Sequence, residues 1–354
     1  MRNVSLIGIR WGAEHWIVDC GEAAQSRLRQ SATMNVSRLN RIFITHMHGD
    51  HTWGLLGVIA SNLIGNNNPS PLTIYGPPGL ADFCVKALRS TYTSFSPYLL
   101  RVHELGVHNG FHADQNGIIT VYEDSGFLIR AAPIKHSIPC FGYVFEEKER
   151  RGSLKVESLR ELGVHPGPEY RHIQDQWRSE RISISTSLPD SNSPQEIVVD
   201  RDQVMEEPVQ GRKLVVLGDT CDPSGMASIA QDPCLIIHEC TLPSKYEKLA
   251  TSRGHSTGSM AARFAKSLHA RALVLTHFSP RFSDELLASE LKATSEIFPG
   301  QIFAATDFDV IDLPKRACSG SDPTALTLFQ YPWGASSSDA ESAHILSEEF
   351  TTGL

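Results

Sequence analysis

Residues 45–51 carry the clearest chemical signal in the chain, because they place four side chains that can bind metal within six residues. The segment reads Thr-His-Met-His-Gly-Asp-His and follows a run of β-branched and aromatic residues. Its glycine predicts a tight loop, in which His46 and His48 can face one metal while Asp50 and His51 turn toward a second. Imidazole and carboxylate ligands suit Zn²⁺ and related divalent ions. The segment therefore predicts a two-metal site.

Two metals need more ligands than this loop supplies. Further candidates follow other apolar runs, and they are His136, Asp219 and His277. Each of them alone could equally be a buried or turn residue without a metal. Together with the loop they favour one shared site, because strand ends hold polar side chains rigidly.

The elements that would position these side chains are short β-branched or aliphatic runs, which are typical of buried strands. The runs lie at 16–18, 42–45, 214–218, 235–237 and 273–276, and they end in order at Asp19, His46, Asp219, His238-Glu239 and His277. Helices are predicted between them, at 79–88, 256–268 and 284–298, the second with Ser256 as its cap. This alternation predicts an α/β fold.

Residues 146–210 differ from the rest, because they are charged, polar and rich in Ser and Pro, with a short helical piece near 154–162. We expect an inserted arm with little core of its own, within a catalytic domain that spans 1–315. The tail at 316–354 is Ser-rich, and we expect it to be disordered.

The bulk composition is that of an ordinary globular protein, with 354 residues, 41% hydrophobic and 20% charged. No apolar run approaches the ~20 residues that span a bilayer, and the first residues do not read as a secretory signal. The 7 scattered cysteines are interpreted as small buried hydrophobes and favour a reducing, intracellular compartment, the cytoplasm or nucleus. The net charge of −8 weighs against a nucleic-acid partner, although metals and a local basic patch can supply positive charge.

The chain resembles the metallo-β-lactamase superfamily, and within it the ribonuclease Z family (tRNase Z, short form), from Arg2 to about Leu313. Residues 45–51 alone indicate only the superfamily. The more specific segments are His-Glu-Cys-Thr at 238–241, Gly-His-Ser-Thr at 254–257 and Pro-Gly-Pro at 166–168. Further matching segments lie at 17–22, 74–77, 136–143, 218–220 and 276–279. The resemblance implies the metallo-β-lactamase fold, a four-layer αβ/βα sandwich, and a homodimer.

The resemblance also implies a role for each matching residue. The ligands of one metal would be His46, His48 and His136. The ligands of the other would be Asp50, His51 and His277, with Asp219 bridging the two. Asp19 and His238 would orient ligands. Residues 146–210 would be an exosite for the tRNA elbow, with its turn at Pro166, Gly167 and Pro168.

The family's reaction is endonucleolytic removal of the 3′ trailer from precursor tRNA, which leaves a 3′-hydroxyl. Two divalent ions, with Zn²⁺ the expected species, would hold the phosphate oxygens and lower the pKa of a water. Asp50 would accept a proton, and His255, oriented by Glu239, would donate one to the leaving oxygen. A purely structural pairing of Glu239 with His255 is the alternative.

The sequence departs from the family pattern in three places. The usual first strand, with its Gly-rich turn, is missing before Arg2, which predicts an exposed sheet edge. Cys240 and Ala23-Ala24 replace an alanine and a Gly-Thr pair. The stretch 169–207 carries many acids, which predicts weakened tRNA affinity.

Two other functions stay open. One is hydrolysis of a small substrate by a phosphodiesterase, lactonase or thioesterase, which would have no need of a long polar arm. The other is a regulatory homologue with little catalysis, against which the full ligand set argues.

Overall fold

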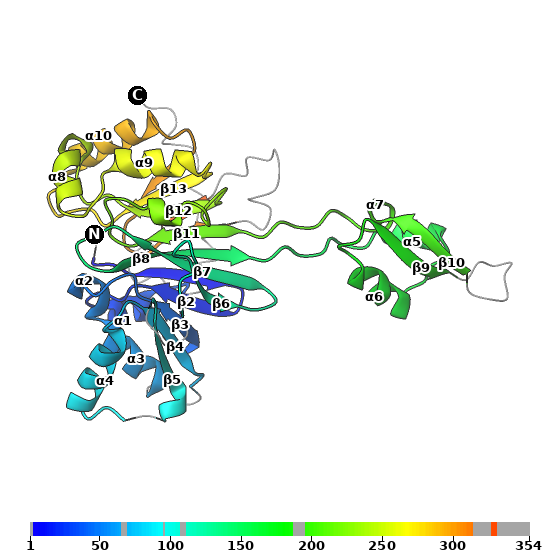
Figure 1. Ribbon diagram of the computed structural model, residues 1–354, viewed down its shortest axis with the longest axis horizontal. Helices are drawn as coiled ribbons and strands as arrows, with labels where there is room; N and C mark the ends of the chain where they lie inside the picture. Colours follow the sequence, from blue (N-terminus) through cyan, green and yellow to red (C-terminus); the bar gives the residue numbers. More distant parts are fainter. Residues whose placement is uncertain are drawn as a thin grey trace. The chain divides into compact units, whose positions relative to one another are not determined.

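The computed structural model describes residues 3–64, 69–94, 96–106, 111–186, 195–313 and 327–330. The chain divides into two compact units (Figure 1). One is built on Met1–Glu146 and Lys213–Pro314, and the other on Glu147–Arg212. Within the described ranges, no helix combines the length and apolar character that crossing a membrane requires.

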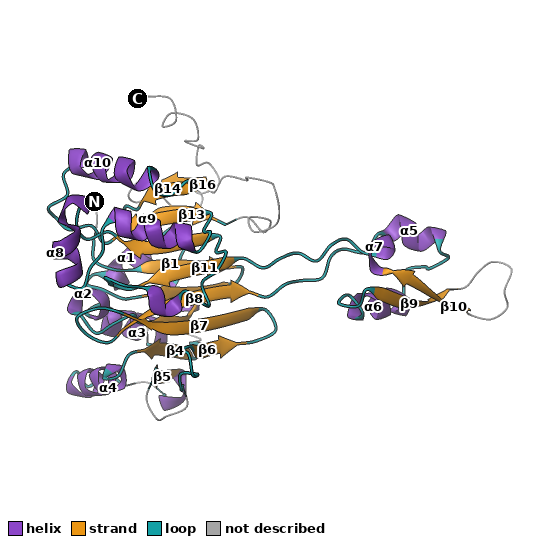
Figure 2. Ribbon diagram, turned by 45° about the horizontal axis from the view of Figure 1, so that its top comes forward, coloured by secondary structure: helices purple, strands orange, loops and turns teal. Residues whose placement is uncertain are grey.

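The first sheet of the larger unit has five strands in the order β1-β2-β3-β4-β5. The strands are β1 (Ile7–Trp11), β2 (Glu14–Val18), β3 (Leu39–Phe43), β4 (Leu72–Gly76) and β5 (Leu100–Glu104). The pair β1–β2 is antiparallel, and the later pairs are parallel. One face is covered by α1 (Ala24–Gln30), α3 (Leu55–Leu63) and α4 (Leu80–Ser90) (Figure 2), whose leucines pack on Ile17, Ile42 and Ile74. Short helical turns are α2 (Gly49–Thr52), η1 (Val36–Arg38) and η2 (Pro97–Leu99).

The second sheet has seven strands in the order β14-β13-β12-β11-β8-β7-β6. The strands are β6 (Ile119–Glu123), β7 (Phe127–Ile134), β8 (Cys140–Glu147), β11 (Lys213–Leu217), β12 (Leu235–Glu239), β13 (Ala272–Thr276) and β14 (Gln301–Ala304). The strands β11 to β14 run parallel to one another. Its outer face is covered by α9 (Gly258–Ser267) and α10 (Asp284–Ser295) (Figure 2). The connections include η3 (Ser224–Met226), η4 (Ser244–Tyr246) and α8 (Glu247–Ser252).

An aromatic cluster fills the space between the two sheets. From the first sheet, the Trp16 ring lies 5.1 Å from that of Phe127 in the second. Likewise, Phe43 lies 5.4 Å from Tyr143 and 5.0 Å from Phe145. Because successive strand residues point to opposite faces, Ile17 and Ile42 next to these rings face the helices instead. The layers are therefore helix, sheet, sheet, helix, which confirms the predicted four-layer sandwich.

The unit at Glu147–Arg212 has a hydrophobic core, so the expectation of little core is wrong. Its elements are α5 (Val156–Glu161), α6 (Pro168–Asp175), β9 (Arg181–Thr186), β10 (Gln195–Asp200) and α7 (Arg201–Val204). The buried side chains are Leu159, Val164, Ile173, Ile182, Ile184, Val199, Val204 and Met205. Each short element contributes only one or two of them, which is why the sequence shows no long apolar run here.

The predicted strands before the polar residues are confirmed as β2, β3, β11, β12 and β13, and the predicted helices as α4, α9 and α10. The cap assigned to Ser256 is wrong. Thr257 caps α9 by accepting a hydrogen bond from Met260 N, while the Ser256 hydroxyl donates to the carbonyl of Thr220. Most of the tail at 316–354 lies outside the described residues, but β16 (Thr327–Gln330) pairs with β15 (Asp309–Asp312).

The cysteines also depart in part from expectation. The thiols of Cys20, Cys84, Cys140 and Cys240 are free and buried, as predicted. Cys234 is also buried, whereas Cys221 is partly exposed, so the interpretation as buried hydrophobes does not extend to Cys221.

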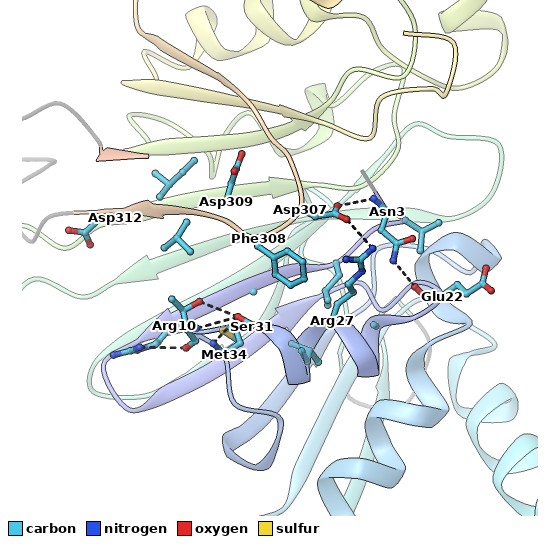
Figure 3. Close-up of a pocket in the computed structure, with 18 residues that line it drawn as sticks. Asn3, Arg10, Glu22, Arg27, Ser31, Met34, Asp307, Phe308, Asp309 and Asp312 are labelled. Carbon is cyan, nitrogen blue, oxygen red and sulfur yellow. Dashed lines mark hydrogen bonds and ion pairs between the residues drawn. The ribbon is translucent and has the colours of Figure 1, made fainter. Parts of the chain in front are cut away.

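β1 is the edge strand of the first sheet, with β2 as its one strand partner in the described part of the chain. A groove of about 490 Å³ lies beside it, lined from β1 by Gly8 and Arg10 and from the opposite side by Phe308 and the residues of β15 (Figure 3). One end is closed by Asp307, which binds the Asn3 backbone N–H and the Arg27 guanidinium (Figure 3). β1 is therefore the last strand on this side of the sheet, and the groove separates it from β15.

Candidate metal centre

The predicted ligands come from loops that follow strands of both sheets in the larger unit. Two of these loop residues, Asp19 after β2 and His277 after β13, have left-handed backbones with φ of 59° and 56°. Residues other than glycine rarely adopt this conformation, and such strain concentrates at functional sites. In both cases it turns the side chain out of the strand direction and toward the cluster.

His46, His48 and His136 form one group of converging ring nitrogens. His46 Nε2 lies 3.0 Å from His48 Nδ1, and His136 Nε2 lies 3.3 Å from the same atom. His46 is completely buried. Burial lowers the pKa of His46 to about 3, so its imidazole is neutral at physiological pH.

Asp50, His51 and His277 form the second group. His277 Nε2 lies 3.3 Å from both His51 Nε2 and Asp50 Oδ2. Asp50 and His51 belong to α2, the short helix that follows His48. Gly49 leaves room for the neighbouring Trp53 ring, because a Cβ at this position would lie 2.1 Å from that ring.

Asp219 lies between the two groups. Its carboxylate oxygens are 3.9 Å from His46 Nε2 and 3.6 Å from the Nε2 atoms of His51 and His277. Burial raises the pKa of Asp219, but His277, His51 and His46 outweigh it and hold the pKa well below its usual value. The side chain is thus a buried carboxylate within reach of both ligand groups.

The outer nitrogens of four histidines are held by hydrogen bonds. His51 Nδ1 donates to Asp19 Oδ2 at 2.6 Å, and His136 Nδ1 donates to the carbonyl of Gly254 at 2.7 Å. His46 Nδ1 lies 3.0 Å from Thr45 Oγ1, and His277 Nδ1 lies 3.0 Å from Thr241 Oγ1. Because these hydroxyls donate to Asp19 and Glu239, they accept from the histidines. The Nε2 atom of each of these four histidines therefore faces the cluster, where it can bind a cation in its unprotonated form.

The orienting partners Thr45, Thr241 and Gly254 were not singled out from the sequence. A signal was available, since each stands within a motif that carries a ligand or catalytic candidate: Thr45 before His46, Thr241 after Glu239, and Gly254 before His255. Threonine and glycine are not typical metal ligands, so their residue types alone do not draw attention to them. Only the folded chain shows which histidine each of them orients.

The donor set fits divalent cations. Converging lone pairs at 3.0 to 3.3 Å cannot all be satisfied by hydrogen bonds among themselves. Burial lowers the pKa of His277, but Asp219 and Asp50 outweigh it and raise the pKa to about 9. The carboxylates thus hold a proton that a cation would displace, which is the usual coupling between ligand protonation and metal binding.

Glu239 and His255 are paired beside this cluster. His255 Nδ1 donates to Glu239 Oε1 at 3.1 Å, and Glu239 also accepts hydrogen bonds from Thr220 N and Thr241. Burial lowers the pKa of His255, but Glu239 and Asp219 outweigh it and raise the pKa above its usual value. The pairing leaves His255 Nε2 as the nitrogen available to a substrate.

The remaining sequence candidates are not among the converging ligand atoms of the described residues. His238 is buried with Nδ1 bonded to the carbonyl of Glu239, and it belongs to no group of converging ligand atoms in the described ranges. It points to the other face of β12 from Glu239, as alternation along a strand requires. Pro166, Gly167 and Pro168 belong to the second unit, where Pro168 begins α6.

Asp19 gives a direct test of the orienting network. It accepts hydrogen bonds from Thr45 N at 2.8 Å and from His51 Nδ1 at 2.6 Å, and it is buried. We expect Asp19→Asn to weaken metal binding about 10- to 100-fold, because an amide cannot serve all these donors. Chelator competition on the purified protein measures this. An unchanged metal affinity in folded D19N would remove Asp19 from the orienting role.

Comparison with known proteins places the chain in a family. The family model described as "Anti-Pycsar protein Apyc1" matches residues 3–91. Ribonuclease Z of Brevibacillus brevis is 34% identical over 329 residues, covering 91% of this chain and 95% of the relative. Ribonuclease Z of Trichodesmium erythraeum is 37% identical, covering 89% and 91%. The crystal structure of human tRNase Z, short form, aligns with a TM-score of 0.59 and 27% identity over 88% of this chain and 93% of that one. With this similarity over nearly its whole length, the chain belongs to the ribonuclease Z family.

Proposed function

We propose that this protein is a metal-dependent endoribonuclease that removes the 3′ trailer from precursor tRNA and leaves a 3′-hydroxyl. The observation that carries the proposal is the pair of ligand groups around Asp219, with Glu239 and His255 beside them, in a chain of the ribonuclease Z family. His46, His48 and His136 would hold one divalent ion. Asp50, His51 and His277 would hold the other, and Asp219 would serve both.

When bound, two such ions supply positive charge to phosphate oxygens and lower the pKa of a water toward neutrality. Residues of the chain itself fix the orientation of the ligands. Asp19, Thr45, Thr241 and the Gly254 carbonyl lock the histidine rings, so that little reorganisation is needed when the substrate arrives.

Asp50 is the residue best placed to take a proton from the attacking water. Its side chain is 44% exposed, whereas that of Asp219 is 5% exposed, so solvent and substrate reach Asp50 more easily. The hydrogen bond from His277 is the main cause that lowers the pKa of Asp50 to about 2, so the side chain is an ionised carboxylate at physiological pH.

His255 would give a proton to the departing 3′ oxygen of the tRNA. Its side chain is 20% exposed, and its inner nitrogen is tied to Glu239. A carboxylate behind an imidazole fixes the ring and favours its protonated form, as a general acid requires. Glu239 is in turn held by Thr220 N and Thr241, so the pair is rigid.

The unit at Glu147–Arg212 would bind the body of the tRNA. It exposes Arg171 and Arg178, and the Arg178 guanidinium lies 4.1 Å from the Trp177 ring centre. Arginines and a neighbouring aromatic ring are suited to phosphates and unstacked bases. Because the chain carries a net charge of −8 and the stretch 169–207 is rich in acids, binding of the tRNA body would depend on these two arginines.

The double substitution Arg171→Ala and Arg178→Ala tests this. We expect the KM for precursor tRNA to rise about fivefold with kcat unchanged, because interactions with phosphates are kept from ground state to transition state. The slope of log KM against log salt should fall by about 1 for each arginine–phosphate interaction that the substitutions remove. Arg263→Ala, on the surface of α9, is the matched control. An unchanged KM in the double variant would argue against tRNA binding by this surface.

The first experiment is cleavage of a 3′-extended precursor tRNA by the purified protein, with and without a chelator, beside a nitrophenyl phosphodiester. Chelator-sensitive cutting directly after the discriminator base supports the proposal. Hydrolysis of the small ester alone would instead favour a small-substrate phosphodiesterase. No cleavage of either, in protein shown to hold two metals, would favour a regulatory homologue.

Two finer points belong to the same proposal. Zn²⁺ is the metal we expect from the histidine-rich ligand set, and two ions per chain is the expected ratio. A homodimer is the expected assembly, from the family resemblance. Metal analysis of the purified protein and light scattering after size exclusion measure these quantities, and a monomer or a single metal would contradict them.

A further inference from the structure

A buried carboxylate outside the metal cluster, Glu290 on α10, contacts a segment that orients two of the cluster's histidines. Glu290 is only 3% exposed. Its Oε2 accepts a hydrogen bond from Ser244 N at 2.7 Å, and its Oε1 accepts from Ser244 Oγ at 2.6 Å and from Gly258 N at 2.7 Å. Gly258 is the first residue of α9, so the carboxylate lies at the positive end of that helix.

The segment concerned is residues 240–258, which leave β12 and return to the start of α9. It supplies the Thr241 hydroxyl to His277 Nδ1 and the Gly254 carbonyl to His136 Nδ1. It also carries His255. One segment therefore orients one ligand from each of the two metal groups.

Glu290 binds both ends of this segment at once. Ser244 lies near its beginning, and Gly258 is its last residue. The two ends are joined further by the hydrogen bond from Ser259 N to Ser244 Oγ, at 3.1 Å. By binding both ends, the carboxylate fixes the separation of the two ends of the segment. The Thr241 hydroxyl and the Gly254 carbonyl, which the segment carries, are thereby held in position.

The packing at Gly258 shows how closely the carboxylate and the helix start approach each other. A Cβ at Gly258 would lie 2.7 Å from Glu290 Oε1 and 2.5 Å from Thr294 Oγ1. Both distances are shorter than side chains tolerate, so any larger residue would displace Glu290. Helix propensity alone favours alanine over glycine in this position, so the glycine is explained by this close approach.

We propose that Glu290 is a positioning residue of the metal centre, which acts through residues 240–258 to hold the acceptors for His136 and His277 in place. It touches neither a proposed ligand nor the substrate. The role rests on the metal site of the proposed function, and it can be tested by metal affinity without any assay of cleavage.

The test compares Glu290→Gln with Thr294→Val. The amide of E290Q offers one acceptor where the carboxylate offers two, and its NH₂ group faces N–H donors. T294V removes a buried hydroxyl that bonds only to the backbone of its own helix, at Glu290 O, so it destabilises α10 but keeps the carboxylate. Metal affinity by chelator competition, melting temperature, and kcat and KM for precursor tRNA are measured for both variants and the wild type.

We expect E290Q to bind metal about tenfold more weakly, with a lower kcat and an unchanged KM, whereas T294V keeps wild-type metal affinity despite a lower melting temperature. Gly258→Ala should show the same loss of metal affinity as E290Q. It replaces E290Q in the comparison if E290Q does not fold. Metal affinity within twofold of wild type in E290Q, or an equal loss in T294V, would overturn the proposal. A wild-type protein that holds metal but cleaves no precursor tRNA would refute the proposed function, while the affinity comparison would still decide the role of Glu290.

Discussion

Asp219→Asn is expected to lower kcat/KM for precursor tRNA by at least about 10³-fold. The carboxylate stands 3.6 to 3.9 Å from nitrogens of both ligand groups, and no other carboxylate in the described ranges reaches both. The amide keeps the shape of the side chain but removes its charge and one acceptor. We therefore expect the variant to fold and to lose at least one of its two metals, which metal analysis beside steady-state cleavage would measure.

Asp232→Asn is the matched control, because Asp232 is also a loop aspartate but its side chain is 79% exposed and has no part in the proposed metal site. It should cleave like the wild type. If D219N retained two metals and a rate within tenfold of wild type, Asp219 could not be the shared ligand, and the site would have to be reassigned.

His255→Ala is expected to slow cleavage of precursor tRNA by about 10²- to 10⁴-fold with metal content intact. The physical reason is the leaving group: a ribose 3′ oxygen departs slowly as an anion and needs a proton. A nitrophenolate is already a stable anion, so hydrolysis of a nitrophenyl phosphodiester should fall far less. Both substrates are measured with the same preparation of the variant, which separates proton donation from damage to the site.

A loss of less than about tenfold on precursor tRNA, with both metals bound, would contradict the acid role. Equal losses on both substrates together with a missing metal would instead favour a structural role for the Glu239–His255 pair. His269→Ala, at an exposed position, controls for the general effect of removing a histidine.

The order of residue types along the chain was enough to predict an α/β fold and to nominate candidate ligands, whereas the four-layer sandwich was expected from the family resemblance. Short β-branched runs indicate strands. A polar residue that follows such a run lies near the end of that strand, and this holds independently of the rest of the chain. That local rule applies to His46 after β3, Asp219 after β11 and His277 after β13. The same reasoning failed for Ser256, because a choice of cap between neighbouring Ser256 and Thr257 depends on which hydroxyl the helix start faces.

The core of the unit at Glu147–Arg212 was missed for a different reason. Its buried residues are spread over five short elements and the segments between them, and none of the elements has enough turns or alternations to show a period. Apolar residues such as Ile173 and Val204 count as core only once their elements have been brought together.

What the sequence determined by itself is the set of candidate metal ligands and the strands that deliver them, because both follow from residue types and short-range periodicity, whereas His255 was identified by the family resemblance. Only the tertiary structure decided which nitrogen of each histidine faces the cluster, since that depends on partners distant in sequence. His136 is held by the Gly254 carbonyl, 118 residues away, and His51 by Asp19, 32 residues away. Glu290 is a further case, because its partners Ser244 and Gly258 lie 46 and 32 residues before it, and no local pattern links them.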